Sequence, residues 1–156
     1  MDKFFIAIGL AVLCLMSPLQ AGEVPVSVNA WARATPPGGS SGAIYGEFRN
    51  HSAEVQMVTA IRFDLAHHAM VHETSHSDGM ARMQAGTLRL PAAGSTILAP
   101  GGLHIMLMGL SEGLKTGCEY SFELTWADGS VSRHAFLTGE YGQMAAPDTA
   151  IRKDCP

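Results

Sequence analysis

Hydrophobic and polar positions alternate with a period of two along much of the chain. The clearest run covers residues 118–126. Its apolar positions are Cys118, Tyr120, Phe122, Leu124 and Trp126. Shorter runs of the same kind occupy residues 24–30, 44–49 and 131–137. Because successive side chains of a β-strand point to opposite faces, each run predicts a strand with one buried face.

Turn-forming residues separate these runs. Segments 36–42, 91–94 and 100–102 are rich in Pro and Gly, and Asp128-Gly129 is typical of a tight hairpin between two strands. We expect the apolar face of the strand after this hairpin to consist of Val131, Ala135 and Leu137. No long stretch has the 3.6-residue period of an amphipathic helix, so the pattern predicts an all-β, antiparallel β-sandwich.

The first residues have the composition of a secretory signal peptide. Lys3 provides a short basic start, and residues 4–16 form an almost unbroken apolar run. A small residue, Ala21, offers a cleavage site, so we expect residues 1–21 to be removed on secretion. The apolar run is shorter than the roughly 20 residues that a transmembrane helix needs, and we expect no membrane span in the mature chain.

Cys14 offers an alternative, because it could anchor a lipoprotein. Leu13 is a poor fit directly before a lipidated cysteine, and we therefore favour cleavage after Ala21. Beyond that point we expect one β-sandwich domain at 22–140, followed by a C-terminal tail at 141–156 in which the alternation is lost.

Composition narrows the class of protein further. The chain has 156 residues, of which 47% are hydrophobic and 15% charged, as in a single globular domain. A net charge of −4 without any basic run argues against a nucleic-acid partner. Cys118 and Cys155 remain in the mature chain, and in an oxidising compartment they most simply form one disulfide. Two free thiols are the alternative.

Histidine and methionine are concentrated between residues 67 and 108. The residues concerned are His67, His68, His72, His76 and His104, together with Met70, Met80, Met83, Met106 and Met108. Thioether sulfur is a soft donor that prefers Cu(I), and imidazole also binds copper well. Thiolates are liable to form disulfides in an oxidising compartment. A His/Met site therefore suits a carrier of Cu(I) outside the cytoplasm.

Spacing selects four of these donors. His104 and Met106 are two positions apart on a predicted strand, so their side chains share a face. His72 and Met83 fit two neighbouring strands joined by the polar loop 75–79. We expect the four side chains to converge at one end of the sandwich, with His104 and Met106 at the surface end of their strand.

The other donors in this segment have simpler expected roles. Methionine is commonly a core residue, and we expect this role for Met70, Met80 and Met108. An auxiliary Cu(II) site is a further hypothesis, because Cu(II) favours nitrogen donors. Its candidates are His67, His68 and His76, for which a solvated cluster without metal is the alternative.

The order of the four selected donors resembles the signature of the PCuAC family of periplasmic copper chaperones. Ten residues separate His72 from Met83, and a His104-x-Met106 pair follows. Flanking segments of the same appearance are 31–35, 71–74, 80–83, 98–110 and 114–117, so the resemblance spans roughly residues 24 to 138. The segment between Met83 and His104 is one residue shorter than in the family pattern, and we expect the turn at 91–94 to absorb the difference.

The resemblance implies a cupredoxin-like β-sandwich of the Greek-key type. It implies that Cu(I) binds to His72, Met83, His104 and Met106. It also implies that the protein supplies copper in the periplasm for the copper centres of cytochrome oxidase, with an oxidase copper-centre subunit or a Sco-type assembly factor as partner. No catalytic turnover is expected of such a protein.

Three other functions compete with this interpretation. A blue-copper electron carrier needs a Cys thiolate with two His ligands, and Cys118 has no His within the fifteen residues that follow it. A zinc enzyme needs three His or carboxylate ligands, and the chain has no His-Glu-x-x-His motif. A metal-free secreted module that binds another protein through its Met-rich face is the remaining alternative.

Overall fold

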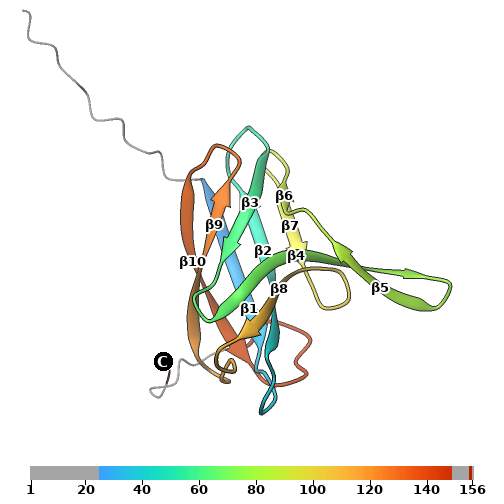
Figure 1. Cartoon of the computed structure of the whole chain (residues 1–156). Coiled ribbons are helices and arrows are strands. Elements are labelled where there is room, and N and C mark those ends of the chain that lie inside the picture. The colour runs from blue at the N-terminus through green and yellow to red at the C-terminus, as the bar shows by residue number, and fades with distance from the viewer. Residues whose placement is uncertain (1–24, 149–154, 156) are drawn as a thin grey trace, which may run out of the picture.

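The computed structural model describes residues 25–148 and Cys155, and these residues form strands without any helix (Figure 1). The strands are β1 (Val26–Arg33), β2 (Ser41–Asn50), β3 (Gln56–Arg62), β4 (Ala66–Ser77), β5 (Met80–Ala85), β6 (Arg89–Leu90), β7 (Ser95–Leu98), β8 (Leu103–Leu110), β9 (Glu119–Trp126) and β10 (Val131–Gly139). Among the described residues, none forms a helix of the length and hydropathy that crossing a membrane requires.

The strands form one path in the order β5-β4-β8-β2-β1-β10-β9-β3-β6, with β7 paired to β2. All pairs are antiparallel except β1 with β10, which run parallel. The sheet curls over itself, so that Phe48 of β2 meets Phe122 of β9 across the interior, with ring centroids 6.5 Å apart. The prediction of an all-β sandwich is confirmed, and the β1–β10 pair makes it mixed instead of purely antiparallel.

The interior is filled by the apolar faces that the alternation predicted. Every apolar position of the run at 118–126 is buried, and Trp126 is 1% exposed. Other large, fully buried side chains are Phe48, Phe122, Phe136, Ile44, Leu88, Leu90, Leu98, Ile105, Leu107, Leu114 and Leu124. Burial of this much apolar surface is the main favourable term in folding. It fixes which face of each strand remains outside.

The hairpin at Asp128-Gly129 joins β9 to β10 as predicted. The backbone and hydroxyl of Ser130 both donate hydrogen bonds to Asp128 Oδ1, which lowers the pKa of the Asp128 carboxyl. The predicted apolar face of β10 is wrong, however. Val131 is 58% exposed, whereas Phe136 is 1% exposed.

The register set by this turn explains the error. It pairs Phe136 with Tyr120 and Val131 with Thr125, so the even-numbered residues of β10 face the interior. A one-residue difference in the turn reverses every facing of a strand.

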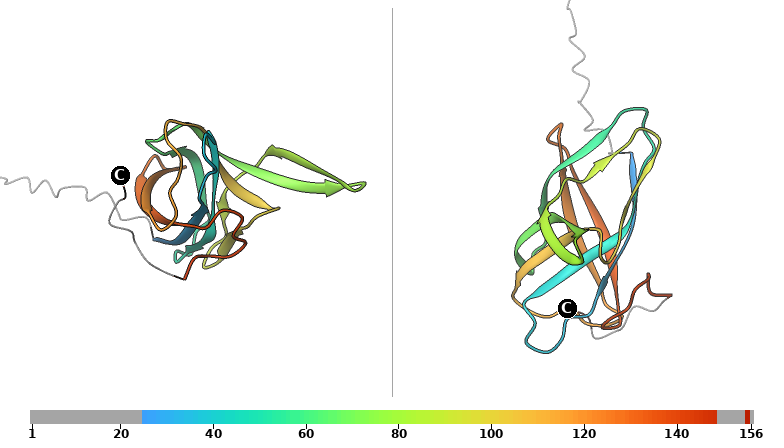
Figure 2. Two further views of the ribbon diagram at one scale, coloured as in Figure 1. Left: turned by 90° about the horizontal axis from the view of Figure 1, so that it is seen from below. Right: turned by 90° about the vertical axis from the view of Figure 1, so that its right-hand side faces the viewer.

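A hairpin of β4 and β5 projects sideways from the sandwich (Figure 1; Figure 2). Its turn is Asp78-Gly79, and both residues have positive φ, 54° and 74°. Positive φ at both central positions is the geometry of the tight hairpin turn that Asp-Gly favours. Strand β4 therefore continues to Ser77, within the segment 75–79 where we expected a polar loop. All of β5 is exposed.

The chain after β10 folds back against the sandwich. The guanidinium of Arg33 donates to the carbonyl oxygen of Gln143 and contacts the sulfur of Met144. Cys118, at 0% exposure, is joined to Cys155 by a disulfide with a Cα–Cα distance of 5.4 Å. The expected signal peptide at 1–21 and the alternative anchor Cys14 lie outside the described residues.

Candidate metal centre

Strands β5, β4 and β8 lie side by side and carry the candidate donors. His72 is directly opposite His104 in the β4–β8 pair, and Met83 is opposite Thr74 in the β4–β5 pair. The neighbouring Val71–Ile105 pair faces the core, since both side chains are buried. Side chains that alternate with Val71 and Ile105 along these strands then lie on the opposite face, which we call the outer face. Its members include His72, Thr74, Met83, His104 and Met106.

The facing of Met83 does not depend on the length of chain between Met83 and His104. The β4–β5 register fixes Met83 relative to His72, and the β4–β8 register fixes His72 relative to His104. Both registers are set through β4. The shorter spacing noted in the sequence therefore leaves Met83 on the outer face with the other three residues.

His104 is held in one orientation by its surroundings. Its Nδ1 lies 2.9 Å from the carbonyl oxygen of Gly102, and a carbonyl can only accept. Nδ1 must therefore carry the proton and donate it, which leaves a free lone pair on Nε2. Metal-binding histidines typically have such a partner on the second ring nitrogen. The expectation that His104 lies at the surface is wrong, because its side chain is 4% exposed.

His72 has a buried ring nitrogen that no group within residues 25–148 satisfies by a hydrogen bond. The rings of His72 and His104 are 6.0 Å apart between centroids and nearly perpendicular. Among the described residues, no hydrogen-bond partner reaches Nδ1 of His72, although that atom is buried. An orphaned buried polar atom costs about 1–3 kcal/mol. A cation bound beside the two rings would offset this cost.

A cleft of about 420 Å³ opens beside these rings. Met83, His104 and Met106 line it together, and Tyr141 closes part of its rim from the segment after β10. Met83 is 56% exposed, so its thioether is reachable from solvent. The cleft thus brings together donors from β5 and β8, while His72 adjoins it through its contact with His104.

Tyr45 also lines the cleft beside His104, and it was not identified from the sequence. Its ring lies 6.3 Å from that of His104 and 4.9 Å from that of Trp31. Burial raises the pKa of the Tyr45 phenol, and the nearby Arg33 guanidinium, 5.6 Å from the ring, opposes that rise. The alternation at 44–49 put Tyr45 on the face opposite Ile44, but it carried no sign that this face is covered.

The other methionines of the segment do not fill the core. Met70 is 40% and Met80 57% exposed, and Met108 is half-buried on the outer face. The core expectation is wrong because Val71, Ile105 and Leu107 already occupy the inner face of these strands. Met80 is three positions from Met83 on β5, so the two side chains point to opposite faces.

The structure does not bring the three candidates for an auxiliary Cu(II) site together among the side chains that it describes. His67 and His68 are both exposed and successive on β4, and the side chain of His76 lies outside the described residues. Within the part of the chain that the structure describes, no group of three or more His, Cys, Asp or Glu side chains is arranged to hold a metal ion. A metal site at the cleft would therefore need the thioethers of Met83 and Met106 in addition to imidazole.

Sequence comparisons identify relatives of the chain. The family model described as "LpqE-like: Putative lipoprotein LpqE-like" matches residues 26–135. A protein of Leifsonia xyli subsp. xyli (strain CTCB07), named "Putative lipoprotein Lxx21020", is 37% identical over 115 residues. The match covers 72% of this chain and 68% of that protein.

Solved structures share the fold. The solution structure of CuI-DR1885 from Deinococcus radiodurans is 32% identical with a TM-score of 0.61, covering 78% of this chain and 83% of that one. The apo PCuAC domain from PmoF1 has a TM-score of 0.62 at 18% identity, covering 79% of this chain and 95% of that one. These similarities confirm the cupredoxin-like β fold and the resemblance to the PCuAC family.

Proposed function

Because the chain belongs to the LpqE-like family and shares its fold with PCuAC domains, we propose that it is a copper chaperone. It carries one Cu(I) ion between His72, Met83, His104 and Met106. The solved relative CuI-DR1885 is named for its bound Cu(I), which supports the same cargo here.

One observation carries the proposal. Two separate strand registers bring His72 opposite His104 and turn Met83 and Met106 to the same outer face. The unsatisfied Nδ1 of His72 and the Nδ1–H of His104, donated to Gly102, leave both rings with a nitrogen available for a cation. Two imidazoles with two thioethers form a soft, neutral donor set, which suits Cu(I) better than zinc or harder ions.

The same donor set favours a carrier over an enzyme. All four groups are neutral, and none needs to exchange a proton while the ion is bound. Met83 is on an exposed strand, so one ligand can be replaced by a ligand of an acceptor without opening the core. We therefore propose ligand exchange at Met83 as the first step of transfer.

We place this role in the periplasm. The lipoprotein names of the relatives support export, and so does the disulfide between Cys118 and Cys155. Delivery to copper-centre assembly of cytochrome oxidase, through an oxidase copper-centre subunit or a Sco-type assembly factor, completes the proposal. Mass analysis of the exported protein tests the export step: cleavage after Ala21 gives an unmodified chain, whereas a lipid on Cys14 gives an acylated one.

An auxiliary Cu(II) ion at His67, His68 and His76 stays a separate prediction. His67 and His68 leave opposite faces of β4, so the two rings cannot chelate one ion from a regular strand. Such a site therefore depends on movement of the strand or on donors from elsewhere. Electron paramagnetic resonance of the Cu(II)-loaded protein would show a nitrogen-rich site if it exists.

A Cu(I) titration tests the main proposal. The exported protein competes with a colorimetric Cu(I) chelator in ascorbate, which keeps copper reduced and leaves disulfides intact. The variant is His104→Gln with Met106→Leu, because alanine at the buried His104 would leave a cavity. We expect its affinity for the first ion to fall more than about 100-fold, since a change of an outer partner alone costs 10- to 100-fold.

Two results would overturn the proposal. One is a wild-type protein that takes no copper from the chelator. That result would favour the metal-free secreted module, with the outer face as its protein-binding surface. The other is a variant that is fully folded by circular dichroism and binds Cu(I) as tightly as the wild type.

A further inference from the structure

The outer face continues past the proposed copper ligands in two more cross-strand pairs. Two residues along β4 and β8 from the His72–His104 pair, Met70 is opposite Met106, and two residues further His68 is opposite Met108. The register from Ala66 to Glu73 runs without a shift. The side chains of His68 and Met70 on β4, and of Met106 and Met108 on β8, therefore lie on the same face as His72 and His104.

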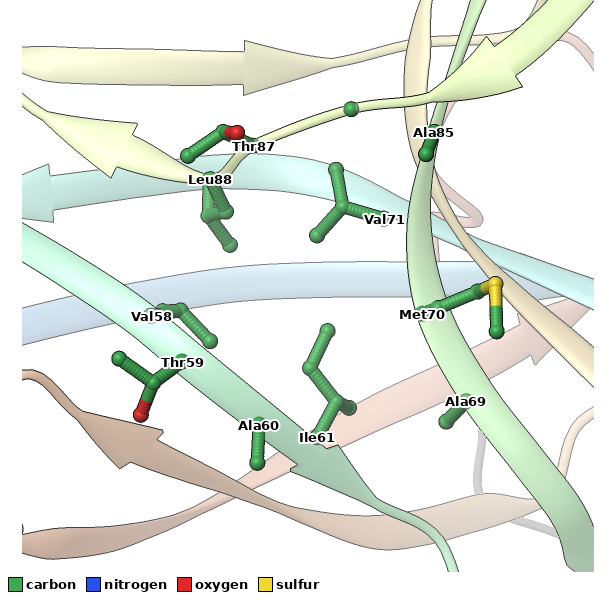
Figure 3. Close-up of a pocket in the computed structure, with 11 residues that line it drawn as sticks. Val58, Thr59, Ala60, Ile61, Ala69, Met70, Val71, Ala85, Thr87 and Leu88 are labelled. Carbon is green, nitrogen blue, oxygen red and sulfur yellow. The ribbon is translucent and has the colours of Figure 1, made fainter.

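Two of these further donors are largely open to solvent. Met70 is 40% exposed, and His68 is exposed as well. Met70 is one of the residues that line the apolar groove of Figure 3, where its thioether extends away from Ile61, whereas Ala69 points toward Ile61. Among the described residues, no side-chain hydrogen bond or ion pair holds His68.

We propose that His68, Met70 and Met108 form a second site for a soft, filled-shell cation such as Cu(I). Directly opposite residues have Cβ atoms about 4.5–5.5 Å apart, and diagonal neighbours are within reach of long side chains. The imidazole of His68 and the sulfurs of Met70 and Met108 can therefore meet at one ion. One nitrogen and two sulfurs make a trigonal, soft donor set.

The second site is separate from the first. His68 is four residues from His72 on the same strand, which corresponds to about 13 Å. The two sites share no ligand, and screening weakens the repulsion between two bound ions because His68 and Met83 are open to solvent. The Met70–Met106 pair lies between the two sites, so the outer face offers an unbroken line of soft donors along which an ion can move by ligand exchange.

The second site is expected to bind more weakly than the first. It has three donors instead of four, and its histidine is exposed and unsupported, whereas His104 is buried and oriented by Gly102. An exposed, loosely held site gains and loses an ion readily. That behaviour suits the entry or exit point of a carrier.

Methionine-methyl NMR with Ag(I) tests the inference on the wild-type exported protein. Ag(I) is a soft, filled-shell stand-in for Cu(I) that does not oxidise. With methyl-¹³C methionine, each sulfur reports separately. We expect the first equivalent to shift the methyls of Met83 and Met106, and the second to shift those of Met70 and Met108. Met57 and Met80 are exposed methionines elsewhere and should stay unchanged.

A pair of variants separates this inference from the proposed function. His68→Gln with Met108→Leu should remove only the second equivalent, and His104→Gln with Met106→Leu should remove only the first. If no equivalent shifts Met83 and Met106 in the wild-type protein while Met70 and Met108 do shift, the inference stands without the proposed function. Methyls of Met70 and Met108 that stay unshifted at two equivalents overturn it, and so does a second equivalent that survives the former variant.

Discussion

The two histidines of the candidate site differ in how the fold supports them. His104 is buried, donates to the Gly102 carbonyl and packs near Tyr45. His72 lies on the same outer face, but its buried Nδ1 has no hydrogen-bond partner among the described residues. The imidazole of His104 is therefore fixed by a hydrogen bond, whereas that of His72 is less constrained. In the proposed site, the thioethers of Met83 and Met106 would complete the shell from more exposed positions.

Met83 and Met80 offer a matched pair of substitutions. Both are more than half exposed on β5, and they point to opposite faces. Met83→Leu should weaken Cu(I) binding at least about tenfold, because it removes a ligand and not merely an outer partner. Met80→Leu should leave affinity unchanged. Chelator competition on both variants checks this, and equal affinities would remove Met83 from the proposed shell.

At this scale the sequence predicted which candidate donors share a face better than it predicted their surroundings. The order of His72, Met83, His104 and Met106 is visible as spacing alone. The burial of His104 is not, because it results from Tyr45 and the turn at Gly102, which are distant in the sequence or unremarkable in it. Local alternation says which residues share a face, but it does not say whether another segment covers that face.

Among the elements, the β4–β5 hairpin has the greatest effect on the site. Its turn, Asp78-Gly79, sets the register that brings Met83 opposite Thr74. A different turn length would turn Met83 to the other face, where Met80 now lies. The Asp-Gly pair was a signal that the sequence contained, and the polar residues around it hid the continuation of both strands.

Gly79→Ala should loosen this hairpin. Gly79 has a φ of 74°, and alanine there costs about 1 kcal/mol, although nothing blocks its Cβ. If the strain frees Met83, Cu(I) affinity falls by up to about fivefold.

Gly129→Ala is the matched control for this effect. Gly129 has a φ of 83° and equally open space, but it lies in the β9–β10 hairpin, away from the cleft. It should lower the free energy of unfolding by a similar amount without changing affinity. Chelator competition and urea unfolding measure both quantities. Parallel losses of affinity in the two variants would contradict the role assigned to the β4–β5 turn.

Over the whole molecule, the pairing of distant strands is what local patterns cannot predict. The runs at 44–49 and 118–126, and the described part of the run at 24–30, predicted strands, and β2, β9 and β1 confirm them. The parallel pairing of β1 with β10 joins segments about a hundred residues apart, and neither strand signals its partner. The inner face of β10 was likewise decided by its pairing with β9. Val131 and Leu137 are as apolar as Phe136, but the register of that pair puts them on the opposite face of the strand.

The disulfide stabilises the whole molecule by lowering the conformational entropy of the unfolded chain. Cys118 and Cys155 are 37 positions apart, and closing a loop of that length stabilises the fold by about 3–4 kcal/mol. Cys155→Ala, which spares the buried Cys118, should lower the free energy of unfolding by that amount in urea. Wild-type protein with reductant should behave like the variant. Two alkylatable thiols in untreated wild-type protein would contradict the bond.

The central claim is that imidazole and thioether groups bind one ion together. X-ray absorption at the copper edge of the exported protein, loaded with one equivalent of Cu(I), measures the ligand shell directly. We predict a mixed shell of nitrogen and sulfur neighbours, with the sulfur contribution falling in Met83→Leu. A shell of nitrogen alone, or one that Met83→Leu leaves unchanged, would contradict the claim.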